Sequence, residues 1–104
     1  MEILQKIYGI VKERAEKPQE GSYTNYLLAK GIDKVCKKLG EEATETVIAA
    51  KNNNKAEFVG ECADVFYHIL VLMYMQGVTT NDVSIELENR FGKGGYHGRK
   101  DPAK

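Results

Sequence analysis

Apolar side chains recur every three or four positions along most of this chain, with charged residues between them. This is the spacing of amphipathic α-helices rather than of strands. One helix is expected before Pro18, and three more from Ile32 to about Lys51, from Lys55 to about Gln76 and from Thr79 to about Arg90. The sequence therefore predicts an all-α fold resembling a four-helix bundle.

The boundaries between these segments carry residues that begin and end helices. The stretch Ser22-Tyr23-Thr24 offers a hydroxyl N-cap for a short helical turn over residues 25–30, which Gly31 ends. Thr79, with an aspartate three residues later, has the pattern of a capping box. The three asparagines 52–54 leave only a short turn between the two longest helices, so we expect these two to form the central antiparallel hairpin.

The two hairpin helices differ in their apolar surfaces. The first carries one stripe, which we expect to be its core face: Ile32, Val35, Cys36, Leu39, Ala43, Val47 and Ala50. The second is apolar almost all round from Val65 to Met75, as expected of a central helix that is buried on most sides. Cys36 and Cys62 fall on these surfaces without a CxxC pair or a histidine partner, so we expect reduced, buried, structural thiols rather than zinc ligands.

Acidic residues gather on the same two helices, at the spacing that places them on one helix face. Glu42 and Glu45 are three residues apart on the first helix, and Glu61 and Asp64 are three apart on the second. Both acidic stripes flank the surfaces that must pack together, so we expect four carboxylates to converge. Like charges at short range repel or take up protons unless a cation neutralises them. Oxygen ligands favour Mg²⁺, with Mn²⁺ as a substitute, over zinc.

A structural interpretation of the same residues stays open. The glutamates of the first helix can form a solvated face, paired with lysines one turn before them. Asp64 fits that interpretation less well, because it directly precedes the apolar run 65–70, where a charge without a partner is costly. His68, one turn after Asp64, either orients a carboxylate or touches phosphate, or it is a hydrogen-bonded structural residue.

The composition of the chain mainly excludes classes of binding partner. The 104 residues carry 15 basic and 15 acidic side chains, so no overall field draws the protein to nucleic acid or to an anionic membrane. No signal sequence and no uninterrupted apolar run of membrane length is found, which predicts a cytoplasmic protein. Residues 1–92 form one expected domain, and 93–104 a flexible, Gly-rich, basic tail in which His97 has no expected role.

Beyond these patterns, residues 22–52, SYTNYLLAKGIDKVCKKLGEEATETVIAAKN, closely resemble the phosphoribosyl-ATP pyrophosphohydrolase family, and ECADVFYHILVLM and ELENRFGK continue the resemblance. It covers about 70 of the 104 residues. The motifs EExxE and ExxD are shared by the wider all-α NTP pyrophosphohydrolase superfamily, whereas SYT, AKG and GEEATE leading into VIAAKN are narrower. Cys62, where alanine is more usual, and the tail GGYHGRKDPAK depart from the family pattern.

The resemblance implies an all-α NTP pyrophosphohydrolase fold and an activity. The reaction is hydrolysis of 1-(5-phosphoribosyl)-ATP between its α and β phosphates, which gives 1-(5-phosphoribosyl)-AMP and pyrophosphate in histidine biosynthesis. Glu42, Glu45, Glu61 and Asp64 match the superfamily's magnesium ligands. Glu41 is an additional acid that positions water or a second ion.

Substrate contacts are expected around this centre. Ser22 and Thr24, at a helix start with free amides, offer a seat for phosphate. We expect further contacts from side chains near the acidic face, for each of which a solvated or structural role is the alternative: Lys30, Lys38, Lys51, Asn52 and His68.

Two alternative functions and a homodimeric assembly are also considered. The same metal site would serve a nucleotide-pool hydrolase that acts on simple or modified (d)NTPs. A non-catalytic metal-binding or interaction protein of the ferritin-like kind would use Glu-x-x-His, whereas this chain has Glu-x-x-Glu and Glu-x-x-Asp. The apolar surface between Val65 and Met75 predicts a homodimer through that helix, in which residues 22–30 of one subunit approach the carboxylates of the other.

Overall fold

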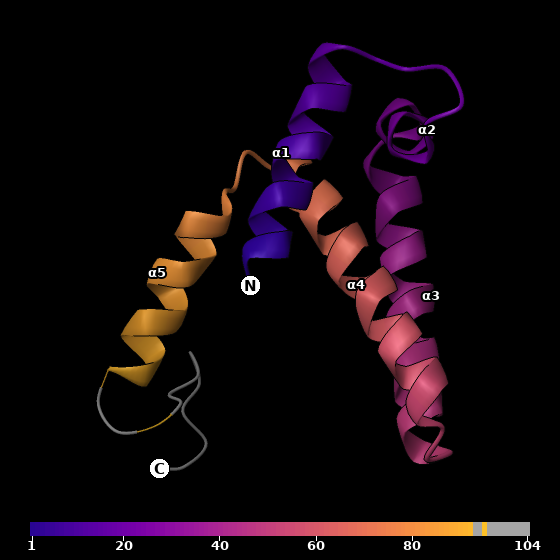
Figure 1. Cartoon of the computed structure of the whole chain (residues 1–104), viewed down its shortest axis with the longest axis vertical. Coiled ribbons are helices and arrows are strands. Elements are labelled where there is room, and N and C mark those ends of the chain that lie inside the picture. Colours follow the sequence, from indigo (N-terminus) through magenta and orange to yellow (C-terminus); the bar gives the residue numbers. More distant parts are fainter. Residues whose placement is uncertain (93–94, 96–104) are drawn as a thin grey trace.

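The computed structural model describes residues 1–92 and Gly95, and over these residues it consists of five α-helices and no strands (Figure 1). The helices are α1 (Glu2–Glu16), α2 (Tyr23–Lys30), α3 (Ile32–Lys51), α4 (Lys55–Met75) and α5 (Thr80–Phe91). The all-α prediction is confirmed. The short turn predicted before Gly31 is a helix of eight residues, which raises the number of helices from four to five. Apart from Gly95, the predicted tail with His97 lies outside the described residues.

Side-chain caps mark the starts of α2 and α5, although α2 begins two residues before the predicted turn. The Ser22 hydroxyl accepts a hydrogen bond of 3.2 Å from the amide of Asn25, and so begins α2. Gly31, with a φ of 94°, separates α2 from α3 in a conformation that favours glycine. Thr79 and Asp82 form the capping box of α5, with side chain to backbone hydrogen bonds of 3.1 and 2.9 Å.

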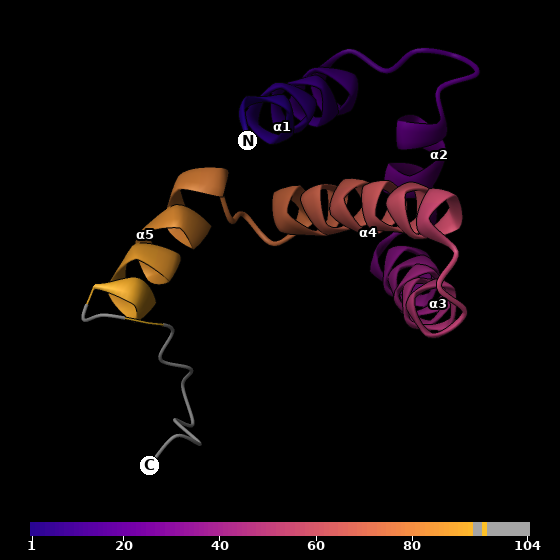
Figure 2. The same ribbon diagram turned by 60° about the horizontal axis from the view of Figure 1, so that its bottom comes forward.

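Helices α3 and α4 form the antiparallel hairpin around which the rest is arranged (Figure 1). Helix α1 lies against α4 on the side away from α3, and α2 packs across the end of the hairpin where α3 begins (Figure 2). Helix α5 leaves α4 and touches only α1 to any extent, so it extends away from the other four (Figure 2). Helix α4 is thus central, as predicted.

The fully buried core is small and lies at the α2 end of the hairpin. Each of the first four helices contributes one residue with no exposed surface, namely Val11, Leu27, Val35 and Val71. Partly buried apolar side chains from α1, α2 and α4 surround them. The closed end of the hairpin, at the turn 52–54, has no comparable centre among the described residues, and α5 has no buried residue at all.

The prediction that the apolar stripe of α3 is its core face is confirmed for Val35 but wrong for most of the stripe in the single chain. The buried residues of α3 are Val35, Glu42 and Ala49, seven residues apart, and they face α4. The centre of the stripe lies about a quarter of a turn away. Val47 is therefore 61% exposed. The same offset makes the predicted burial of Cys36 wrong: its thiol is free and exposed, and that of Cys62 is free and half-buried.

Helix α4 was expected to be buried on most sides, and in the single chain it is not. Only His68, Leu70 and Val71 are buried along it. Phe66, in the middle of its apolar run, is 42% exposed. Among the described residues α4 is also the one helix that is long and apolar enough to cross a membrane, a test that core helices of soluble proteins pass as well. Two carboxylates, Glu61 and Asp64, interrupt its apolar stretch.

Candidate active site

Three of the four predicted carboxylates meet in the middle of the hairpin. One oxygen from each of Glu42, Glu45 and Glu61 lies within 4.8 Å of the other two. Glu42 occupies the buried line of α3 between Val35 and Ala49 and is only 8% exposed. The packing of α3 on α4 therefore places a carboxylate where an apolar side chain would otherwise fill the interface.

Asp64 stands at the edge of this group rather than inside it. Its side chain is exposed, and it is not among the three residues that converge within 4.8 Å. It lies close enough to affect Glu42. Burial raises the pKa of Glu42, and the carboxylates of Asp64 and Glu45 raise it further, whereas the contact with Glu61 lowers it. The four predicted ligands therefore form three converging residues and one neighbour.

Among the three converging carboxylates, the charge of Glu61 is the least stabilised. Its Oε1 oxygen is buried and has no hydrogen-bond partner. Desolvation, together with the adjacent carboxylates of Glu42 and Glu45, raises the pKa of Glu61 to about 7. An unpartnered carboxylate oxygen beside two other carboxylates has the donor set that a hard divalent cation prefers. The residues present therefore fit a metal ion.

The hairpin has two distinct sides beyond this line of contact. At about 100° per residue, Glu45 is rotated away from Glu42 on α3, and Asp64 away from Glu61 on α4, toward the same side of the antiparallel pair. We call this side the acidic side. The opposite side, the apolar side, carries exposed residues from both helices: Ile32, Val47, Phe58, Phe66 and Ile69.

Basic residues also reach the acidic side. The Lys38 ammonium lies 3.7 Å from the carboxylate of Glu41. Tyr23, and to a smaller extent the carboxylates of Glu41, Glu42 and Glu45, raise the pKa of Lys38, against partial burial that lowers it. Glu41 is exposed and ion-paired, as the solvated-face interpretation expects, whereas the buried Glu42 does not fit that interpretation.

His68 connects the start of α2 to the carboxylate helix. It is 4% exposed, and its Nδ1 lies 2.7 Å from the backbone carbonyl of Asp64. Since a carbonyl only accepts, Nδ1 donates and Nε2 is left to accept from the Tyr23 hydroxyl at 3.2 Å. Beside it, the hydroxyls of Thr24 and Tyr67 share a hydrogen bond of 2.6 Å. His68 is thus fully hydrogen-bonded within the protein.

Sequence reasoning missed Tyr23 and Tyr67, although their neighbours Thr24 and His68 were identified. Their rings stack with centroids 6.1 Å apart. This contact depends on how α2 docks on α4, and the periodicity of either helix contains no information on that docking. The hydroxyls of Ser22 and Thr24, predicted as a phosphate seat, are already engaged in a cap and in the bond to Tyr67.

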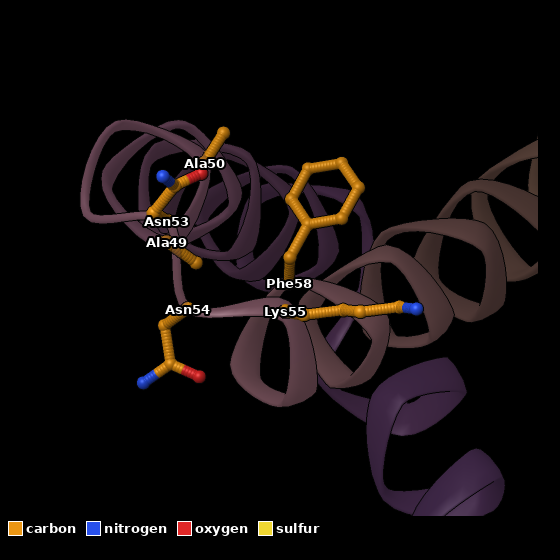
Figure 3. Close-up of a pocket in the computed structure, with 6 residues that line it drawn as sticks. All are labelled: Ala49, Ala50, Asn53, Asn54, Lys55 and Phe58. Carbon is orange, nitrogen blue, oxygen red and sulfur yellow. The ribbon is translucent and has the colours of Figure 1, made fainter.

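The remaining predicted substrate residues lie at two ends of the hairpin. Lys30 is at the end of α2, and its ammonium lies 5.8 Å from the centre of the Tyr26 ring. Lys51 and Asn52 end α3 at the opposite, closed end of the hairpin. Near that end an open pocket of about 300 Å³ lies between the last turn of α3 and the first turn of α4 (Figure 3). Its lining residues are Ala49, Ala50, Asn53, Asn54, Lys55 and Phe58.

Comparison with known proteins supports the resemblance found in the sequence. A family model described as phosphoribosyl-ATP pyrophosphohydrolase matches residues 4–91. A phosphoribosyl-ATP pyrophosphatase from Listeria welshimeri is 54% identical over 91 residues, which cover 88% of this chain and 87% of the relative. A protein of the same name from Clostridium acetobutylicum is 49% identical over 89 residues, covering 86% of this chain and 81% of the relative.

A third relative is much longer than this chain. The histidine biosynthesis bifunctional protein HisIE of Caldanaerobacter subterraneus is 55% identical over 93 residues, which cover 89% of this chain but 45% of the relative. The chain therefore spans less than half the length of this bifunctional relative, and most of the length of the two pyrophosphatases.

Proposed function

The chain belongs to the phosphoribosyl-ATP pyrophosphohydrolase family, and we propose that it hydrolyses 1-(5-phosphoribosyl)-ATP to 1-(5-phosphoribosyl)-AMP and pyrophosphate, a step of histidine biosynthesis. The structural observation that carries the proposal is the convergence of Glu42, Glu45 and Glu61 in the hairpin interface. The proposal covers the pyrophosphohydrolase reaction only, because the chain spans less than half of the bifunctional relative.

We further propose that Glu42, Glu45 and Glu61 hold Mg²⁺, with Asp64 completing the site from its edge and Mn²⁺ as a possible substitute. The unpartnered oxygen of Glu61 supports this, since a cation would satisfy it and offset the repulsion among the three carboxylates. When bound, the ion supplies neutralisation of phosphate charge and a lower pKa for a coordinated water.

The chain's own residues complete the chemistry by positioning. Hydrolysis forms a bond from a water oxygen to phosphorus and breaks the bond to the bridging oxygen, so that pyrophosphate leaves and the water proton must be accepted. We propose that Glu41, which is exposed and ion-paired with Lys38, accepts a hydrogen bond from that water. Lys38 adds a positive charge on the acidic side, where the leaving phosphates gain negative charge.

The other predicted contacts are proposed in two groups. Ser22, Thr24 and Lys30 lie at the α2 end of the hairpin, and Lys51 and Asn52 at its closed end. His68 has both ring nitrogens engaged, so we assign it the positioning of the Asp64 turn rather than a contact with phosphate.

We also propose that the active protein is a homodimer assembled through the apolar side of the hairpin. The exposed Val47 and Phe66 on this side are apolar residues that a single chain leaves in water. A stable dimer buries on the order of 1,600 Å² in total, so the proposed interface would have to extend over most of this side of the hairpin. Sedimentation equilibrium at micromolar concentration should show twice the chain's 11.7 kDa, and an active species of single-chain mass would refute the assembly.

Sharing of sites between subunits is a separate proposal. Each chain already places its own Tyr23 and Thr24 against Tyr67 and His68, so contacts from a partner's α2 would be additional to these. Mixing an inactive Thr24→Ala variant with an Asp64→Asn variant tests the idea. Shared sites predict partial recovery of activity in mixed dimers, and self-contained sites predict none.

One assay tests the reaction itself. Purified protein with Mg²⁺ should release pyrophosphate from phosphoribosyl-ATP much faster than from simple (d)NTPs. Equal or faster turnover of simple (d)NTPs would identify a nucleotide-pool hydrolase, and no turnover of either would leave a non-catalytic metal-binding protein. A cytoplasmic location fits a small-molecule reaction of this kind, and fractionation of cells into soluble and membrane parts would test it.

A further inference from the structure

A pair of tyrosines and a pair of lysines stand together where α2 meets α3, outside the carboxylate group. The rings of Tyr23 and Tyr26 stack with centroids 5.8 Å apart and are 45% and 42% exposed. The ammonium groups of Lys30 and Lys34 lie 5.8 and 5.9 Å from the centre of the same Tyr26 ring. Two positive charges thus converge beside an exposed aromatic surface.

This patch borders an open space and adjoins the active site. Tyr23 and Tyr26 line a hollow of about 540 Å³, together with residues 19–22 and Asn25. The Tyr23 hydroxyl is bonded to His68, which is bonded in turn to the backbone of Asp64. Lys34 precedes Glu42 by eight residues of one helix, which places it about 12 Å further along the helix axis. The patch and the carboxylates are therefore about the length of a nucleoside apart.

Stabilisation of the fold accounts for Tyr23, whose hydroxyl is bonded to His68 and whose ring stacks on Tyr67, but not for Tyr26 and the two lysines. Tyr67 also packs α2 onto α4, since its hydroxyl is bonded to Thr24 and its side chain packs against the buried core. Tyr26 leaves nearly half of its surface in water, and two lysines on one ring repel each other. A bound anion would offset that repulsion, and an aromatic ring would cover the exposed tyrosine face.

We propose that Tyr23, Tyr26, Lys30 and Lys34 form the subsite for the end of the substrate that is remote from the scissile bond. Tyr26, held in place by its stack on Tyr23, contacts the adenine, which is electron-poor because it is substituted at N1, and the two lysines beside the Tyr26 ring bind the 5-phosphate of the second ribose. This assignment rests on the proposed function. It makes the patch the determinant of specificity, because a simple nucleoside triphosphate has no second ribose phosphate for the lysines to bind.

Binding of the reaction product tests the subsite without the hydrolytic step. Isothermal titration should show that the wild-type protein binds phosphoribosyl-AMP at least about tenfold more tightly than AMP, a difference expected of one charge-assisted phosphate contact. In a Lys30→Ala/Lys34→Ala double variant the two ligands should bind alike. Tyr26→Leu should weaken both. Lys6→Ala, which removes an exposed lysine of α1, is the control and should keep the wild-type preference.

Turnover separates this proposal from the proposed function. The double variant should raise KM for phosphoribosyl-ATP about tenfold with little change in kcat, because the lost contact is far from the reacting atoms. If the wild-type protein hydrolyses phosphoribosyl-ATP but the double variant keeps its preference for phosphoribosyl-AMP, the subsite is wrong and the function stands. If the wild-type protein releases no pyrophosphate from phosphoribosyl-ATP, the function fails and the subsite with it.

Discussion

The acidic and apolar sides of the α3–α4 hairpin are both incomplete in a single chain, and in opposite ways. On the acidic side Glu45 joins Glu42 and Glu61, so that three carboxylates lie close together. On the apolar side Val47 and Phe66 face water. The first side needs a cation and the second needs another apolar surface. In the proposed assembly, one pair of helices therefore carries both the metal site and the dimer interface, and neither feature stabilises the isolated chain.

Removal of the metal should have the largest effect, and only on the acidic side. Exhaustive chelation with EDTA should abolish release of pyrophosphate, because the carboxylates alone cannot neutralise the phosphates. Excess Mg²⁺ or Mn²⁺ should restore it, while the sedimenting mass stays that of a dimer throughout. Full activity after chelation would contradict the metal assignment, and dissociation on chelation would show that the two sides are not independent.

Neutral substitutions in the carboxylate group should lower activity without lowering stability. Glu42→Gln, Glu45→Gln, Glu61→Gln or Asp64→Asn should each lower kcat by about two to three orders of magnitude. The melting temperature without metal should stay the same or rise, because each change removes like-charge repulsion. Steady-state kinetics and calorimetry measure the two effects. A variant that unfolds more easily yet keeps its specific activity has lost a structural residue, not a ligand.

A charge on the apolar side should break assembly and leave the fold intact. Val47→Asp should weaken the dimer by roughly a hundredfold, because a carboxylate would be buried in the interface. Ile48→Asp is the matched control, since Ile48 is also exposed, at 52%, but points about 100° further round the helix. Sedimentation velocity over a concentration series measures both. Equal dissociation by the two variants would place the interface elsewhere.

The pH dependence of stability should be the smallest effect and confined to the acidic side. The pKa of Glu61 is raised to about 7 in the folded protein, above its value of 4.5 in an unfolded chain. The folded state therefore holds more protons between these values, and stability falls as the pH rises through this range. Without metal, the melting temperature should be a few degrees higher at pH 6 than at pH 8. Glu61→Gln should flatten this difference, and a wild-type protein that is more stable at pH 8 would contradict the assignment.

Most of the fold followed from local chemistry, which explains why its boundaries could be predicted. Ser22, Gly31 and Thr79 act through their own backbone and the next few residues, so the sequence alone contains the information. The burial of α3 could not be predicted in the same way. Apolar spacing identified a stripe centred between Ile32 and Val47, whereas tertiary packing selected the line that contains Glu42.

The candidate site shows the same difference between features set by local sequence and features set by tertiary packing. Spacing on each helix brought Glu42, Glu45 and Glu61 together correctly, because one short turn fixes how α3 and α4 pair. The exposure of Asp64 and the stacking of Tyr23 on Tyr67 depend on the angles at which three helices meet. Those angles follow from side-chain packing across the whole core and not from the period of any one helix.

The position of the core also determines where the molecule opens. Val35 and Val71 anchor the hairpin at its α2 end, whereas none of the described residues of the turn 52–54 is buried, and local hydrogen bonds hold that turn. Fluctuations that separate the two helices should therefore start at the turn and spread toward the carboxylates in the middle. Backbone amides near Ala49 and Phe58 should exchange with deuterium sooner than those near Val35. A ligand bound to both Glu42 and Glu61 would hold α3 and α4 together in the middle of the hairpin. It would therefore slow hydrogen–deuterium exchange in the half of the hairpin that lies beyond the buried core.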